Sequence, residues 1–352
     1  MNDENKPVRS KRRRIILIVI CVILGLLLAA VLLATAYVHH LLSMIKIGDD
    51  SYLYATLASD QLDALRSDPD HDPDFTGPSI PPEEVPVNTV PSAPKEELQD
   101  DDIINIMIIG DDTRQPKIRQ RSDAMILCSF NVKTNTLTMI SFLRDTYIPQ
   151  IPGFWADKLN AAYAYGGLKT MDETFASYFG VHIDGHVVVQ FEGFKGVIDM
   201  LGGVDISLTE AEVKHLNNSK QWDLTVGVNH LNGEEALAYS RIRKIDMDAR
   251  RAQRQRNVIT ALINAYKNKS VAEMLTLTSK ILESGFIQTD MTSSEILDYV
   301  SKLFPKLKTT TINNLQIPAD GTYESMTVGT ITATKVCDFD ANRKLLEDVL
   351  TP

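Results

Sequence analysis

The chain has 352 residues, 44% of them hydrophobic, and a formal net charge of -10 at neutral pH. This acidic balance disfavours a nucleic-acid-binding protein, because such proteins neutralise phosphates with a basic surface. The three cysteines form no CxxC motif and no Cys/His spacing suited to zinc, so we expect no structural zinc site. Cys128 and Cys337 could pair in an exported protein, but sequence alone does not decide this.

An uncharged stretch of 24 residues, 15–38, follows a short basic tail, residues 1–14. A helix of that length spans the roughly 30 Å hydrocarbon core of a bilayer, and the basic tail is expected to stay in the cytoplasm. A cleaved signal peptide is the alternative, since Ala34-Thr35-Ala36 resembles a cleavage site. The stretch is longer than the roughly 7–15 apolar residues of a signal peptide. The sequence therefore predicts a single-pass, type II cell-membrane protein with an uncleaved signal anchor.

Two segments separate the predicted anchor from the folded domain. Residues 39–66 show helical spacing and are predicted to form an extracellular stalk. Residues 67–102 alternate Pro with Asp and Glu and contain few large apolar side chains, which predicts an extended, disordered linker. The remaining residues, 103–352, show no further linker, and about 250 residues suffice for one sizeable core.

Apolar runs alternate with helical patterns throughout residues 103–352. Strands are predicted at 103–109, 124–131, 137–142, 187–191, 204–208, 309–317 and 327–333. Helices are predicted at 158–166, 168–179, 191–201, 234–239, 249–267, 271–282 and 294–303. This alternation predicts an α/β fold: a single layered domain with a central mixed β-sheet flanked by helices, preceded by one N-terminal transmembrane helix.

Charged residues collect where the first three predicted strands begin or end. Asp111 and Asp112 follow the first strand, and Asp123 opens the second. Such carboxylates could hold Mg²⁺ together with phosphate oxygens and water, although turn and capping roles are the commoner fate of loop aspartates. Arg144, which ends the third strand, is either half of a core ion pair with Asp145 or a ligand that points into a cleft. Ligands of open α/β sheets bind at the carboxyl ends of strands.

A dense basic run extends from Arg241 to Arg256 (RIRKIDMDARRAQRQR) and leads into an apolar helix. In an acidic protein such a run repels itself unless an anion lies among the charges, and guanidinium groups bind phosphate oxygens bidentately. The alternative is a solvated helix face. Arg251 and Gln255 share one helical face, whereas Arg250 is rotated from Arg251 by about 100°. We therefore favour a phosphate-binding site, with Arg250 and Arg256 outside it.

Five strings, together with the N-terminal anchor, resemble the LytR–CpsA–Psr family of Gram-positive bacteria: IGDDTR, RSDAM, LRDTYIP, KLNAAYAYGG and YSRIRKIDMDARRAQRQ. The resemblance covers residues 103–352. It implies a Mg-dependent phosphotransferase that moves an anionic glycopolymer (wall teichoic acid, capsular or a related polysaccharide) from a polyprenyl pyrophosphate carrier onto peptidoglycan. The implied partners are that lipid-linked glycopolymer, peptidoglycan and the cell membrane, with no nucleic acid.

The resemblance also assigns roles to individual residues. Asp112 and Asp123 correspond to the family's metal ligands, for Mg²⁺ or Mn²⁺. The implied pyrophosphate-binding set is Arg121, Arg144, Lys158, Arg241, Arg243, Arg251, Arg254 and Gln255, and the implied catalytic set is Arg121, Arg144, Asp248 and Arg251. The sequence departs from the family pattern at Leu143, at Ala249 and in the Asp111–Asp112 pair, which leaves open which aspartate faces the metal.

A polyprenyl tail, as the resemblance implies, needs an apolar groove. Candidates on two predicted helices are Phe175, Tyr178, Phe179, Phe191, Phe194, Ile198 and Leu201. At helical spacing such residues belong to a core more often than to a pocket. The resemblance alone favours a groove lined by Phe175, Phe179, Phe191, Phe194 and Ile198.

Two other functions are compatible with parts of the sequence. A non-catalytic receptor for polyprenyl phosphate or wall polysaccharide would explain the anchor, but it gives no reason for aspartates beside so many arginines. A pyrophosphate hydrolase that releases the polymer, with water as the acceptor, would use the same site. Neither the polymer, the acceptor hydroxyl nor the oligomeric state is readable from the sequence.

Overall fold

The structure is a computed structural model that describes residues 36–37, 40, 43, 53–59, 61–62, 75–86, 97–111, 120–243, 245 and 248–351. The chain divides into two compact units, Met1–Ile45 and Lys46–Pro352, and the sheets and helices discussed below belong to the second. The predicted membrane span at 15–38 lies almost entirely outside the described residues. Within the described part of the chain, no helix is both long and apolar enough to cross a membrane.

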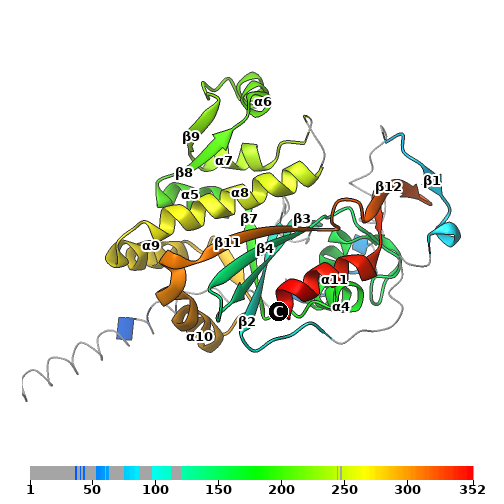
Figure 1. Ribbon diagram of the computed structural model, residues 1–352, viewed down its shortest axis with the longest axis horizontal. Coiled ribbons are helices and arrows are strands. Elements are labelled where there is room, and N and C mark those ends of the chain that lie inside the picture. The colour runs from blue at the N-terminus through cyan, green and yellow to red at the C-terminus, as the bar shows by residue number, and fades with distance from the viewer. Residues whose placement is uncertain are drawn as a thin grey trace, which may run out of the picture. The chain divides into compact units, whose positions relative to one another are not determined.

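A mixed sheet forms the centre of the second unit (Figure 1). Over the described residues it has six strands, in the order β10-β7-β2-β3-β4-β11. Their bounds are β2 Ile103–Asp111, β3 Ser122–Asn131, β4 Thr136–Phe142, β7 Gly185–Gln190, β10 Ile287–Thr289 and β11 Thr311–Ile317. β7 is parallel to β2 and β11 is parallel to β4, whereas the other neighbours are antiparallel. The predicted central mixed sheet is confirmed.

Smaller sheets surround this one. β1 Ser79–Ile80 and β13 Ile331–Cys337 pair with the two sides of β12 Tyr323–Val328. The other two pairs are antiparallel, namely β5 Tyr147–Ile148 with β6 Asp157–Lys158 and β8 Val204–Leu208 with β9 Gly227–Leu231.

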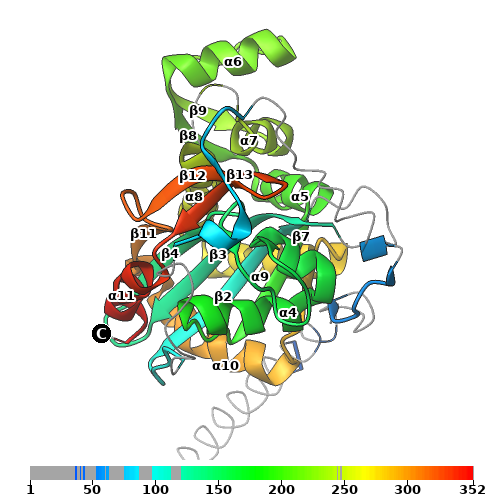
Figure 2. The same ribbon diagram turned by 90° about the vertical axis from the view of Figure 1, so that its right-hand side faces the viewer.

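Helices cover both faces of the main sheet (Figure 2). α4 Asn160–Phe179 and α11 Phe339–Leu350 pack on one face, and α8 Asp248–Lys267 crosses the other, with α5 Phe191–Leu201 and α9 Val271–Ser284 beside it. Further helices are α6 Glu210–Lys220, α7 Gly233–Ser240 and α10 Ser293–Leu303, with the 3-10 turns η1 Pro82–Glu84 and η3 Phe304–Thr309. The predicted flanking of the sheet by helices is confirmed.

Four helix starts share one sequence device, the capping box. A Ser, Thr or Asn side chain accepts a hydrogen bond from the backbone of a Glu three residues later, and that Glu bonds back to the cap. The pairs are Thr209–Glu212, Asn232–Glu235, Ser270–Glu273 and Thr292–Glu295, which begin α6, α7, α9 and α10. Each cap satisfies backbone N–H groups that the first helical turn leaves free, and is worth about 1 kcal/mol.

Three hydrophobic clusters are present among the described residues, and the smallest joins Tyr147 to Met326, Val328 and Val336. In the largest one, formed by the main sheet with α4 and α11, Phe175 and Phe179 are fully buried and meet the Phe142 ring. The second cluster joins α5, α7, α8 and the β8–β9 pair, and it contains Ile198 with Phe194 packed against it. The prediction of one groove lined by residues of both helices is therefore wrong, because Phe175 and Phe179 are core residues in a different cluster.

The folded unit begins before residue 103, contrary to the predicted boundary. β1 pairs with β12, and Leu98 is buried in the largest cluster. Part of the predicted linker thus completes the fold. Its few apolar residues stand singly among prolines and acidic residues, so composition alone does not reveal them.

The segment predicted as a stalk also contributes to the fold. Residues 53–59 and 61–62, here called the strap, pack against the largest cluster through Leu53, which is fully buried, and through Leu57 and Leu62. The Leu57 N–H donates to the Tyr165 carbonyl on α4 (3.2 Å). At least this part of the segment therefore lies on the domain and does not stand away from it.

One expected strand differs from the structure. The predicted strand at 327–333 is wrong, since these residues span a hairpin in which β12 ends at Val328 and β13 begins at Ile331. The predicted division between helices 158–166 and 168–179 is confirmed, because α4 is interrupted at Gly167 (φ +71°, ψ -155°), a non-helical conformation open essentially to glycine alone. α6, β9 and α11 were not expected from the sequence, and α6 in particular has few apolar residues.

Both cysteines outside the predicted span are free thiols. Cys128 lies in β3 and Cys337 ends β13, and they do not form a disulfide. Burial raises the pKa of the Cys128 thiol to about 12 and raises that of Cys337 as well. Because the thiolate is the reactive form, neither residue is a candidate nucleophile.

A buried histidine joins three parts of the domain. His186, at the start of β7, lies between Asp172 of α4 (Nε2 to Oδ1, 2.9 Å) and Asp290 (Nδ1 to Oδ2, 2.7 Å). Burial lowers the pKa of His186, but the hydrogen bonds and charges of the two carboxylates outweigh burial and raise it to about 9. Tyr54 of the strap donates to the same Asp290 carboxylate (3.0 Å).

We expect the free energy of unfolding to depend on this imidazolium. A folded pKa raised from 6.5 to about 9 gives a contribution that is complete below pH 6.5 and is lost as the pH rises through about 9. A shift of that size corresponds to about 3 kcal/mol. Urea unfolding of the full chain in detergent should show this decline, and His186→Gln should remove it. His215→Gln on α6 is the control, and identical pH dependence in all three proteins would contradict the assignment.

Candidate functional site

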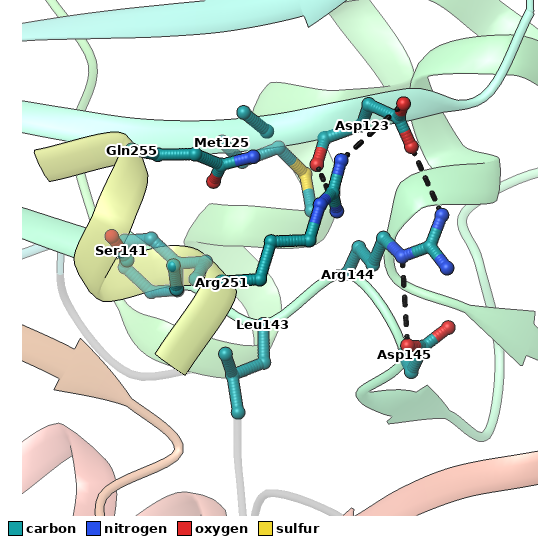
Figure 3. Close-up of a pocket in the computed structure, with 11 residues that line it drawn as sticks. Asp123, Met125, Ser141, Leu143, Arg144, Asp145, Arg251 and Gln255 are labelled. Carbon is teal, nitrogen blue, oxygen red and sulfur yellow. Dashed lines mark hydrogen bonds and ion pairs between the residues drawn. The ribbon is translucent and has the colours of Figure 1, made fainter. Parts of the chain in front are cut away.

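Side chains from three elements meet at one end of the main sheet. β3 and β4 are antiparallel, with Ile126 opposite Ser141, so the start of β3 and the end of β4 lie side by side. The first turns of α8 cross the same end. Figure 3 shows the pocket there, whose lining includes Asp123, Arg144, Arg251, Ala252 and Gln255.

The Asp123 carboxylate is the centre of this arrangement. Its Oδ1 contacts Arg144 Nη1 (3.0 Å) and Arg243 Nη2 (3.2 Å), and its Oδ2 contacts Arg251 Nη2 (3.3 Å). Arg251 Nη1 also donates to the main-chain carbonyl of Asp123 (3.0 Å). The Arg144 and Arg251 side chains are 12% and 6% exposed, whereas that of Arg243 is 43% exposed. Two arginines are thus fixed in the interior and a third reaches in from the surface.

Positive charge exceeds negative charge around this carboxylate. Burial raises the pKa of Asp123, but the charges of Arg251, Arg144, Arg243 and Arg241 lower it, and the pKa lies below its usual value. Asp123 is therefore ionised at any physiological pH. One carboxylate does not neutralise several guanidinium groups, so the cluster retains positive charge that can bind an anion.

Arg144 contacts a second carboxylate as well. Its Nε lies 3.6 Å from Asp145 Oδ2, and Lys158 Nζ lies 3.5 Å from Asp145 Oδ1. The Lys158 side chain is only 1% exposed. The sequence left open whether Arg144 belongs to an ion pair with Asp145 or points into a cleft. The structure shows both, and Lys158 joins the cluster through Asp145.

Arg241 links the pocket to an apolar helix. Its guanidinium lies over the Phe191 ring, 4.4 Å from the centroid, and Phe191 begins α5. A cation over an aromatic face is attracted by the ring quadrupole. Arg241, which was predicted to bind phosphate, therefore contacts Phe191, which was predicted to line the lipid groove. Of the predicted groove residues, Phe191 is the one that the structure places beside a predicted phosphate-binding arginine.

Arg254 points away from Asp123, toward a partner that the sequence analysis missed. Its Nε donates to Glu212 Oε1 at 2.6 Å, and its Nη1 donates to the Ile242 carbonyl at 3.3 Å. Both side chains of this ion pair are buried. Because Ile242 lies between Arg241 and Arg243, Arg254 holds the backbone of the segment that carries these two arginines. In this structure Arg254 braces the site.

Arg121 also belongs to its own buried ion pair. Its Nη2 and Nη1 contact the two Asp157 oxygens at 2.7 and 3.1 Å, and its guanidinium lies 5.9 Å from the Tyr165 ring centroid. The Tyr165 hydroxyl donates to Asp157 too. The structure thus places Arg121, a predicted catalytic residue, in a cluster centred on Asp157 and not among the arginines on Asp123.

The two arginines expected outside the site differ from each other. Arg250 is exposed on α8, as expected for a solvated position. Arg256 is only 4% exposed, and its Nη2 donates to Gln253 (2.6 Å), while its Nε and Nη1 have no hydrogen-bond partner among the described residues. Burial lowers the pKa of Arg256 to about 10. Arg256 is therefore no solvated control, although Arg250 is one.

Asp123 is the predicted metal ligand whose side chain the structure describes, and both of its carboxylate oxygens contact arginines. Asp111, which ends β2, is buried, Asp112 lies outside the described residues, and only the backbone of Asp248 is described, at the start of α8. Among the described side chains, no group of three or more His, Cys, Asp or Glu residues could hold a metal ion. Mg²⁺ is commonly held by one or two carboxylates and completed by substrate phosphates and water.

Of the two ion-pair partners that were not predicted, Glu212 and Asp157, only Glu212 has a local sequence signal. Thr209-x-x-Glu212 is a readable capping box, and Glu212 uses Oε2 for the cap while Oε1 is bound to Arg254. Asp157, by contrast, is 36 residues from Arg121. No local pattern reveals a pair formed across such a separation.

Fold and pocket together define a class of protein: an α/β domain whose sheet ends in a cluster of arginines gathered around one carboxylate, a site suited to a polyanion. The LytR_cpsA_psr family model matches residues 80–344. The chain therefore belongs to the LytR–CpsA–Psr family, and the resemblance seen in its motifs is confirmed. The match begins at β1, in agreement with the place of that strand in the fold.

Similar proteins of known function are teichoic acid transferases. The polyisoprenyl-teichoic acid–peptidoglycan teichoic acid transferase TagU of Bacillus licheniformis is 34% identical over 207 residues, which are 58% of this chain and 65% of the relative. TagU of Bacillus subtilis is 35% identical over 202 residues, 57% of this chain and 64% of the relative. The chain thus spans just under two thirds of these relatives. A solved structure, TagT bound to LIIa-WTA, is 28% identical, with a TM-score of 0.58 over 72% of this chain and 92% of that chain.

Glu212→Gln should destabilise the domain, because the buried Arg254 guanidinium then lacks its counter-charge. Loss of one partner of a buried ion pair typically costs about 3–5 kcal/mol. Glu210→Gln is the matched control, since Glu210 lies in the same first turn of α6 and is exposed. It should change the free energy of unfolding by less than about 0.5 kcal/mol. Urea unfolding measures both, and equal effects would show that the ion pair does not brace the site.

Proposed function

We propose that the chain is a membrane-anchored phosphotransferase that attaches an anionic glycopolymer, carried on polyprenyl pyrophosphate, to peptidoglycan. Family membership and the TagU relatives support this reaction class. The TagT structure bound to LIIa-WTA supports a lipid-linked wall polymer as the substrate class. The basic tail and uncharged stretch at residues 1–38 support a type II anchor with the domain on the wall side of the membrane.

The observation that carries the proposal is the convergence of Arg144, Arg243 and Arg251 on Asp123. A pyrophosphate offers several anionic oxygens, and the planar fork of a guanidinium matches two of them at once. Arg144 and Arg251 are already fixed by other contacts, so little conformational freedom is lost when they bind. A polysaccharide receptor without phosphate chemistry would have no use for this excess of cations.

In the transfer, the acceptor hydroxyl oxygen bonds to the phosphorus next to the glycopolymer, the bridging P–O bond breaks, and polyprenyl phosphate leaves with the proton that the hydroxyl loses. Negative charge develops on the bridging and non-bridging oxygens. Arginines held in place can stabilise that charge without reorganising during the reaction. Because the pKa of Asp123 is lowered, its carboxylate suits charge balance and metal binding better than proton abstraction.

The resemblance to the family makes Mg²⁺ or Mn²⁺ the expected cofactor, held by Asp123 and Asp112. When bound, such an ion supplies positive charge beside the phosphates. Asp145 and Lys158 position Arg144, and Glu212 with Arg254 positions the Arg241–Arg243 segment. On the apolar side, Phe191 lies under Arg241, and the second hydrophobic cluster lies beyond it, with Phe194 and Ile198. That contact supports an apolar path for the lipid that begins beside the phosphates.

The pair Arg251 and Arg250 tests the proposal directly. Arg251→Lys should weaken binding of a polyprenyl pyrophosphate analogue about tenfold or more, because an ammonium cannot reproduce the bidentate contact. Arg250→Lys should leave binding unchanged, since Arg250 is exposed and adjacent in sequence. Calorimetric titration of the full chain in detergent measures both. Equal losses would indicate diffuse electrostatics, and no loss in either variant would mean that the cluster binds no pyrophosphate.

Metal removal tests the cofactor. Transfer of a radiolabelled lipid-linked polymer to peptidoglycan should stop when a chelator is added and resume when Mg²⁺ is restored. Asp123→Ala should abolish transfer at any Mg²⁺ concentration, because it removes the carboxylate on which the arginines and the expected metal depend. Unchanged turnover in the presence of the chelator would refute the metal assignment while leaving the transferase proposal standing.

A further inference from the structure

An unusual surface lies on α10, away from the pocket. None of the 11 residues of this helix is buried. Ile296, Tyr299 and Leu303 are half-buried and face the domain. Leu297, Val300 and Phe304 are 43%, 49% and 36% exposed, and their spacing places them on one side of the helix. This apolar stripe continues from α10 into the start of η3.

Basic residues follow the stripe. Lys302, Lys306 and Lys308 lie in the last turn of α10 and in η3. Lys302 pairs with Asp298 (2.7 Å), and Lys306 donates to the Val132 carbonyl at the end of β3. Lys308 is exposed. An apolar stripe that leads to such a basic side chain is typical of a helix that lies in a membrane interface, where the stripe enters the acyl boundary and an ammonium group reaches the headgroups.

The strap ties this end of the domain to the predicted membrane span. Tyr54 donates to Asp290, three residues before α10 begins, and Leu53 is fully buried beside it in the chain. Tyr54 is 16 residues after Val38, where the predicted span ends. Sixteen residues cover about 24 Å as a helix and about 55 Å fully extended. The point of attachment is thus within reach of the bilayer surface.

We infer that α10 rests on the outer surface of the membrane, with Leu297, Val300 and Phe304 inserted among the lipid headgroups. This rests on the proposed membrane anchor and is independent of the transferase chemistry. The pocket then lies at the far end of β3, which runs from Asp123 at the site to the end contacted by Lys306 (Figure 1). Ten strand residues span about 30 Å. The phosphates are therefore bound about that far from the end of the sheet where α10 lies, on the wall side.

The orientation is testable with the full chain in vesicles of equal parts phosphatidylglycerol and phosphatidylethanolamine. A nitroxide is attached at Ser301→Cys, one turn after Leu297 and exposed, and in a second protein at Asn218→Cys on α6, both in a Cys21→Ala background. We expect the label at 301 to collide several-fold more often with oxygen, which enters lipid, than with a water-soluble nickel chelate. The label at 218 should show the reverse preference.

Two further measurements separate the possible failures. Adding Leu297→Glu and Val300→Glu should return the label at 301 to the behaviour of the label at 218, because charged side chains do not enter the acyl boundary. If the label at 301 is as accessible to nickel as that at 218 in chains that float with the vesicles, the inference is wrong and α10 faces water or another protein. If the chain does not float at all, the anchor proposal fails and this inference fails with it. Loss of transferase activity would affect neither reading.

Discussion

The site depends on one electrostatic constraint: guanidinium groups do not gather in a partly buried pocket without a counter-ion. Asp123 supplies it for Arg144, Arg243 and Arg251, which come from β4, from the segment before α8 and from α8 itself. The antiparallel register of β3 and β4 brings Asp123 beside Arg144, and α8 crosses the sheet at the same end. Removing a single carboxylate would leave several like charges a few ångströms apart, a repulsion that the low dielectric of the pocket strengthens.

The arginines divide into those that face this carboxylate and those that support them. Arg254 is paired with Glu212 and Arg121 with Asp157, each in a buried contact with a carboxylate other than Asp123. A buried ion pair is weak evidence for stability, because desolvation offsets much of the attraction between the two charges. It does fix the direction in which each paired side chain points. Here the fixed direction matters for function, since Arg254 holds the Ile242 carbonyl and with it the segment of Arg241 and Arg243. The arginines of one basic run in the sequence therefore do not form one surface. Their side chains point in different directions and make separate contacts.

Local signals in the sequence predicted most of the fold and part of the site. Continuous apolar runs revealed β2, β3 and β4 because buried strands need no polar alternation, and the Gly167 conformation explains why α4 read as two helices. The β12–β13 hairpin was missed although Gly329, whose φ is +58°, stands between Val328 and Ile331 and is a readable signal for a two-residue turn. At the site, Asp123, Arg144 and Arg251 were predicted and do converge. The roles of Arg121 and Arg254 could not be read in the same way, because their partners are distant in sequence and only the folded chain brings them together.

The two ends of the main sheet differ in chemistry, and this difference bears on how a lipid-linked substrate is handled. One end collects fixed arginines, while the other carries the exposed apolar stripe of α10 and the strap that leads back to the predicted anchor. If the stripe rests on the bilayer, the pyrophosphate reaches the arginines only when its polyprenyl tail lies along the domain. The tail then needs apolar side chains to contact all the way between the two ends of the main sheet. The second hydrophobic cluster includes Ile198 and Phe194 of α5, the helix that Phe191 begins, and extends through α8 to α9. Its central members, such as Ile198 and Val258, are fully buried in packed core, so the orientation requires the lipid to run over partly exposed residues of α5, among them Phe191 and Phe194.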